Sequence, residues 1–257
     1  MAEDRRWRQV PERGTCPVHE RDRVWIERRA AWCAEQFGPP PKTPALPGFA
    51  PRDAAGPAQE RAEDLVRRVA AVMGADVSAL RVRLVDPTPA APPRTWHQVG
   101  EYRAEPEGPV IDLDRTVAAR PDTFAALIAH ELAHARLSGE GRLDGLDLSG
   151  AEEERLTDLV AVHLGLGVLT ANAADNYTRT AGYSVTPLGG LTDWMLTGRR
   201  DEPPRRLGYL TPAEHGYALT CWTLLRSEPH PPWAHHLVPS VRAALTQGLA
   251  YRAARGN

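Results

Sequence analysis

The sequence predicts an α+β fold that is mostly helical, with a small sheet packed against one helix and further helices toward both ends of the chain. Segments with helical periodicity and recognisable start and stop signals recur along the 257 residues. Segments with strand-like alternation are confined to residues 80–113. A chain of this length, 42% hydrophobic, can bury a large core.

Residues 1–58 are predicted to hold an N-terminal helix and a proline-rich connector, and residues 59–257 to form the main domain. Apolar residues recur at helical spacing over residues 21–37, which predicts an amphipathic helix that docks on the main domain. Residues 38–58 contain many prolines and little periodicity. This composition predicts an extended connector and not a packed element.

A second helix and three strands are expected next. Residues 59–73 carry an apolar face and are followed by Gly74. Residues 80–85 alternate, so that Val82 and Leu84 share one face of a strand and the arginines share the other. Residues 95–102 and 109–113 are predicted to form two more short strands.

The helix predicted over residues 121–137 contains His130-Glu131-Leu132-Ala133-His134. Residues four apart on a helix lie on one side, one turn from each other, so the two imidazoles can hold one Zn²⁺. Glu131 between them is placed to act on a water molecule at that ion. Because the neighbouring residues are apolar, unpaired imidazoles here would be costly, which argues against a merely solvated surface.

A third ligand is expected from the following helix, which Ser149 and Glu152 open with a capping box. Glu154 follows His134 by 20 residues, enough to end one helix and bring a second beside the ion. Asp158, four residues further on, shares the face of Glu154 and is placed to accept the free N–H of a ligand histidine. His163 lies on the opposite face and is excluded as a ligand.

The combination of H-E-x-x-H with E-x-x-x-D at this spacing resembles the gluzincin zinc metallopeptidases, which are thermolysin-like. The resemblance covers roughly residues 120–170, where the chain also looks like uncharacterised bacterial proteins with the same zinc pattern. It implies a zincin-like domain with His130, His134 and Glu154 as zinc ligands, Glu131 as general base and Asp158 orienting a ligand histidine. One departure is Glu153, where thermolysin-like enzymes carry Asn.

The remaining chain is predicted to hold a loop, two helices and the residues that would stabilise an oxyanion. Residues 171–187 are polar and are predicted to be a loop. Thr211 and Glu214 form a second capping box, opening a helix through residue 226, and a final helix covers residues 240–255. Tyrosines and histidines near this region are candidates for oxyanion stabilisation; Tyr209 and His215 lead, with Tyr177 and Tyr183 also possible.

Composition limits the classes of binding partner and indicates the cellular compartment. The net charge is −2 without a concentrated basic run, so we expect no nucleic-acid partner. Three widely spaced cysteines imply no disulfide framework, and no signal peptide or membrane-length apolar run is evident, so we expect a cytoplasmic protein without a membrane partner. The pattern predicts no oligomeric state.

The sequence therefore predicts zinc-dependent hydrolysis of a peptide or protein substrate, with Glu131 as the base. Two alternatives remain open: a catalytically silent zinc protein that binds or regulates a partner, and a zinc amidase acting on a small molecule. A glutamate retained between the two histidines favours catalysis, because a purely structural site has no use for a base at that position.

Overall fold

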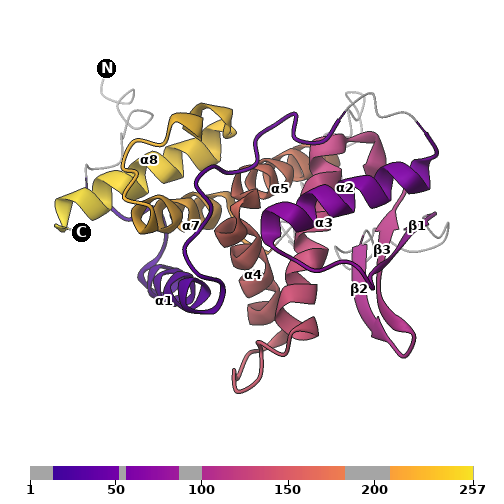
Figure 1. The fold of residues 1–257 in the computed structure, drawn as a ribbon. Coiled ribbons are helices and arrows are strands. Elements are labelled where there is room, and N and C mark those ends of the chain that lie inside the picture. The colour runs from indigo at the N-terminus through magenta and orange to yellow at the C-terminus, as the bar shows by residue number, and fades with distance from the viewer. Residues whose placement is uncertain (1–13, 52–55, 87–99, 183–208, 257) are drawn as a thin grey trace, which may run out of the picture.

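The computed structural model describes residues 14–51, 56–86, 100–182 and 209–256. It is an α+β fold that is mostly helical with one small sheet, as the sequence predicts. The sheet lies at one end of the molecule, α1, α7 and α8 lie at the other, and α3, α4 and α5 run between them (Figure 1).

The described helices follow the predicted boundaries closely over most of the chain. They are α1 (Glu20–Phe37), α2 (Ala58–Met73), α3 (Pro121–His134), α4 (Gly150–Ala161), α5 (Gly167–Gly182), α7 (Pro212–Leu225) and α8 (Pro239–Ala254). Short turns of other helical types are η3 (Val117–Ala119), η4 (Ala135–Gly139), η5 (Val162–Leu166) and η6 (Pro232–His236).

The sheet has three strands, β1 (Arg81–Val85), β2 (Gly100–Glu105) and β3 (Gly108–Asp114), in the order β1-β3-β2. The central strand β3 is parallel to β1 and antiparallel to β2. Its side chains Ile111 and Leu113 are fully buried. Strand β2 is therefore an outer strand, and it contacts α3.

Helix α3, which carries both histidines, lies at the centre of the core. Leu127, Ile128 and Leu132 are fully buried around it. The predicted helix extends past His134 as the wider turn η4 and stops at Gly139. Burial on several sides holds the helix, and with it His130 and His134, in a fixed orientation.

Both predicted capping boxes are confirmed. The hydroxyl of Ser149 accepts the backbone N–H of Glu152, and the Glu152 carboxylate accepts the backbone N–H of Ser149. Thr211 and Glu214 make the same reciprocal pair at the start of α7. These local bonds satisfy amides that the first helical turn leaves without partners, which is why so short a pattern predicts a helix start.

The prediction of a loop from residue 171 is wrong up to residue 182, because α5 continues to Gly182. The chain turns sharply at Gly165, with φ of +96°, and then resumes a helix. Ala171 and Ala173 are buried, and the Asn172 amide bonds to both the carbonyl of His236 and the N–H of Val238. The Asn172 side chain thus has hydrogen-bond partners inside a packed helix. Composition alone does not predict this arrangement.

The first part of the proline-rich connector is packed, contrary to prediction. Ala45 and Ala50 belong to the hydrophobic core. The N–H of Ala45 donates to the carbonyl of Gly165 at 2.8 Å, and the His163 ring bonds to the carbonyl of Gly38 at 2.9 Å. The connector therefore covers the kink between α4 and α5.

We expect Gly165→Ala to destabilise the fold by about 1–3 kcal/mol, as steric strain at positive φ and overpacking typically do. A Cβ at Gly165 would lie 2.6 Å from Cγ of Pro41, and the φ of +96° disfavours any side chain. Urea unfolding measures the change. Gly150→Ala is the control, since a Cβ there meets nothing within 4 Å; equal midpoints for the two variants would contradict the prediction.

Among the described residues, one helical run, Gly150–Ala174, is long and apolar enough to cross a membrane by length and composition alone. Its most apolar window is 94% buried inside the protein. Core helices of globular proteins pass the same test, so this run is weak evidence for a membrane span.

Candidate metal centre

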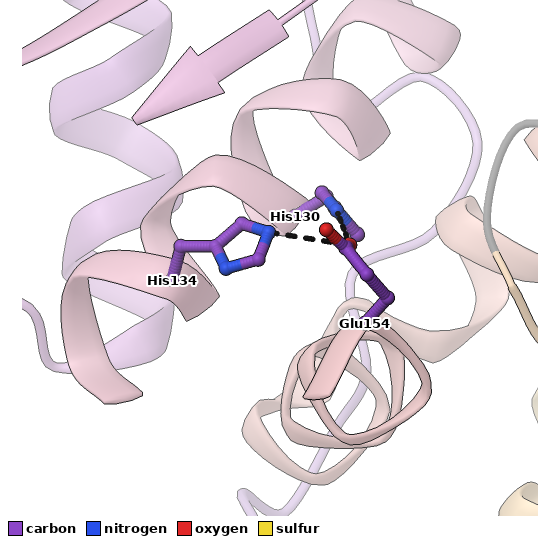
Figure 2. A group of neighbouring side chains, drawn as sticks. All are labelled: His130, His134 and Glu154. Carbon is purple, nitrogen blue, oxygen red and sulfur yellow. Dashed lines mark ion pairs between the residues drawn. The ribbon is translucent and has the colours of Figure 1, made fainter. Parts of the chain in front are cut away.

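His130 and His134 of α3 and Glu154 of α4 point toward one another (Figure 2). The Glu154 Oε2 atom lies 3.2 Å from Nε2 of His130 and 3.4 Å from Nε2 of His134. One ligand atom from each residue lies within 4.8 Å of the other two. The structure thus brings together the three side chains that the sequence predicts as metal ligands.

Two of the three separations match the spacing of ligands around a single metal ion. Two ligand atoms that are each about 2.1 Å from one tetrahedral ion are roughly 3.4 Å apart. The two His–Glu separations, 3.2 and 3.4 Å, match this spacing. Two imidazoles and one carboxylate leave a tetrahedral ion with one further position, the arrangement that catalytic sites require.

The second nitrogen of each histidine has a partner on α4. Nδ1 of His130 donates to Oδ1 of Asp158 at 2.9 Å. Nδ1 of His134 lies 3.4 Å from the hydroxyl oxygen of Thr157, whose own proton goes to the carbonyl of Glu153. Both contacts favour a proton on Nδ1, which directs the Nε2 lone pairs toward the shared site.

Asp158 is itself held firmly. It is 3% exposed, and its Oδ2 atom accepts the backbone N–H groups of Tyr209 at 2.5 Å and Leu210 at 3.0 Å. Burial alone would raise the pKa of this carboxyl, but the bonds from His130 and from the amides hold the pKa below its ordinary value. The charged carboxylate therefore connects the segment just before α7 to His130.

The titration of His130 and Glu154 reflects their contact. Burial acts to lower the pKa of His130, but hydrogen bonds to Asp158 and Glu154 outweigh it and raise the pKa. Burial likewise acts to raise the pKa of Glu154, and the two histidines lower it. Without a metal ion, attraction between these groups keeps the three side chains assembled, and metal binding must displace the proton.

Glu131 lies beside this group and faces strand β2. It is 4% exposed, burial raises the pKa of its carboxyl, and the backbone of Tyr102 donates a hydrogen bond to it. A Cβ at Gly100 would lie 2.6 Å from Oε1 of Glu131, so a larger residue on this strand would displace the carboxylate. Because residue 100 is glycine, the Glu131 carboxylate can occupy this position beside β2.

The group opens into a cleft of about 390 Å³ between α3, α4 and β2. Its walls combine the predicted metal and base residues with side chains of the outer strand and of the turn after α3. The lining residues are Gly100, Glu101, Tyr102, Ala104, His130, Glu131, His134, Ser138, Glu153 and Glu154.

Tyr209 and His215, the leading candidates for stabilising an oxyanion, differ in their position relative to the cleft. The Tyr209 ring stacks near that of His130, with 6.4 Å between centroids and an angle of 16°, so Tyr209 lies next to the site. His215 is 1% exposed and does not line the cleft. Tyr209 is also absent from the cleft lining, so a role of either residue in oxyanion stabilisation stays a prediction. Tyr183 and the side chain of Tyr177 lie outside the described residues.

Sequence reasoning missed Thr157, Gly100 and Tyr102. Thr157 was detectable in principle, because it precedes Asp158 on a helix whose buried face was already assigned. Gly100 and Tyr102 reach Glu131 only because β2 pairs with β3 and folds back against α3. Tyr102 lines the cleft beside Glu131 and becomes a further candidate for contact with substrate.

We expect Asp158→Asn to lower metal affinity about 10–100-fold, the usual effect of losing a residue that orients a ligand histidine. The amide keeps the shape of the carboxylate and one acceptor oxygen but removes the charge that faces His130. Competition with a chromophoric chelator measures the affinity. Thr157→Val, which removes the longer 3.4 Å contact, should have the smaller effect; the reverse order would contradict this assignment.

Compared with protein families, with curated proteins and with solved structures, the chain gives no significant match.

Proposed function

We propose that this protein is a zinc-dependent peptidase. The observation that carries the proposal is the convergence of His130, His134 and Glu154 in one cleft with the buried carboxylate of Glu131. A structural metal site has no need of an additional carboxylate or of an open cleft. A base next to a metal position in an open cleft is what hydrolysis requires.

The residues have distinct roles in this proposal. His130, His134 and Glu154 hold the ion, and Asp158 and Thr157 keep the two imidazoles oriented with Nε2 toward it. A histidine–histidine–glutamate donor set suits Zn²⁺. The helical order and the strand beside α3 are also compatible with the zincin-like domain that the sequence resembles.

A bound Zn²⁺ supplies Lewis-acid chemistry, polarising a substrate carbonyl and making water more acidic. Glu131 accepts a proton from water and later delivers it to the leaving amine. Its raised pKa suits this exchange, because a carboxylate with a higher pKa takes up the proton more readily. Tyr209 and Tyr102, near the site, are the candidates for stabilising the developing oxyanion.

The outer strand β2 favours an extended substrate. It is hydrogen-bonded on one side to β3, and its residues Gly100, Tyr102 and Ala104 line the cleft. An extended peptide can add to such an edge through main-chain hydrogen bonds. This arrangement supports a peptide over a small amide as the substrate.

The test combines metal analysis with digestion of a peptide library. The purified protein should contain about one zinc per chain, and mass spectrometry of the digest should show cleavage products that disappear on chelation and return with added zinc. Zinc at this stoichiometry without cleavage of any peptide would overturn the peptidase proposal and leave a binding or regulatory protein.

A further inference from the structure

We infer that Glu153 is a specificity residue, which selects substrates carrying a positive charge close to the bond that is cleaved. The inference rests on the proposed function, and it assigns a substrate class to the same site. Its basis is an imbalance of charge on the wall of the cleft.

Glu153 is half-buried in the cleft wall and immediately precedes the ligand Glu154 on α4. Among the described residues, the one hydrogen bond to its side chain comes from the hydroxyl of Ser138, which donates to Oε1 at 3.4 Å. No lysine or arginine among the described residues forms an ion pair with it, and none lines the cleft in that part of the chain. The carboxylate thus lines the cleft without a positive partner from the part of the chain that the structure describes.

The other acidic residues of the cleft are already balanced. Glu101 pairs with Arg103 on the outer strand. Glu154 faces both histidines, and Glu131 accepts a hydrogen bond from the backbone of Tyr102. Glu153 is the acidic residue of the cleft lining for which the described residues supply neither a cation nor a short hydrogen bond.

An excess charge in a partly enclosed cleft attracts a cation more strongly than the same charge in open water does. A substrate ammonium or guanidinium group donates charge-assisted hydrogen bonds to a carboxylate, which are about twice as strong as neutral ones. Because Glu153 and Glu154 line the same cleft, the cation that Glu153 binds lies in the cleft that holds the reacting carbonyl. The substrate class is therefore a peptide with a lysine, an arginine or a free amino terminus next to the cleaved bond.

The test measures peptide binding separately from hydrolysis. Zinc-loaded Glu131→Gln protein is titrated with fluorescent peptides that differ only in carrying lysine, glutamine or glutamate at one position. The lysine peptide should bind roughly tenfold or more tightly than the glutamate peptide, a difference of about 1.4 kcal/mol. Adding Glu153→Gln should remove this preference, and adding Glu153→Lys should reverse it.

The matched control is Glu107→Gln in the same background, which removes one negative charge at a side chain that is 72% exposed and does not line the cleft. It should keep the full preference. Equal binding of all three peptides, or a preference unchanged by Glu153→Gln, overturns the inference.

Hydrolysis by the zinc-loaded protein with Glu131 intact is measured on the same peptides and judges the proposed function by itself. A lysine preference in binding without cleavage would uphold the assignment of Glu153 and overturn the peptidase. Cleavage without a charge preference would do the opposite. The melting temperatures of the Glu153 variants show that each is folded before it is titrated.

Discussion

A Glu131→Gln protein is expected to lose peptide hydrolysis by about 10²–10⁴-fold, the usual contribution of a positioned general base, while binding zinc as the unaltered protein does. Glutamine has nearly the shape of glutamate, so it fits the space that Gly100 leaves and can still accept the hydrogen bond from the Tyr102 backbone. It cannot accept a proton at neutral pH. The substitution therefore separates the chemistry from metal binding.

The measurement pairs kcat/KM on a cleaved peptide with zinc content by elemental analysis. Glu107→Gln serves as the control for the loss of one charge, because that side chain is exposed and does not line the cleft. Full activity in Glu131→Gln would remove Glu131 from the role of base. Loss of zinc together with activity would instead mean that the carboxylate supports the metal position.

The convergence of His130, His134 and Glu154 was predictable because two local rules fix most of its geometry. Helical spacing places His130 and His134 on one side of α3, and the capping box at Ser149 sets where α4 begins. Given those two helices, Glu154 and Asp158 share a face by the same spacing. The only long-range assumption was that α4 returns beside α3, and the contact between the two helices confirms it.

The features that could not be predicted depend on contacts between distant segments. The amides of Tyr209 and Leu210 reach Asp158 only because α7 begins beside α4, and no sequence pattern marks that contact. The space that the Glu131 carboxylate occupies depends on strand pairing that brings Gly100 against α3.

Glycine in a sequence favours the end of a helix. At Gly165, however, the positive φ lets the chain bend and then continue as α5. The buried face of α5 and the bonds of Asn172 then outweigh a composition that is typical of loops. Tertiary packing, and not local propensity, determines the secondary structure of such segments.

In the metal-free protein, we expect His130→Ala to cost about 3–5 kcal/mol of unfolding free energy, the range for breaking a buried ion pair by removing one partner. The imidazole of His130 bonds to Asp158 and faces Glu154, and its side chain is 5% exposed. Removing it leaves the buried carboxylate of Asp158 without its charged partner, and Glu154 then faces one histidine instead of two. His134→Ala should cost only about 1 kcal/mol, because its side chain is 18% exposed and its Nδ1 contact with Thr157 is long.

Zinc binding should depend equally on the two histidines, since both are ligands of the same ion in the proposed site. Each variant should lose more than the roughly 100-fold in affinity that an orienting residue accounts for. Zinc at about 100 times its Kd stabilises a folded protein by about 2.7 kcal/mol, so it should raise the melting temperature of the unaltered protein and of neither variant. Melting curves with a chelator and with zinc test both statements on the same samples. A zinc response that survives in His134→Ala would remove His134 from the ligand set, and equal stability of the two metal-free variants would mean that the buried pair with Asp158 does not hold His130 in place.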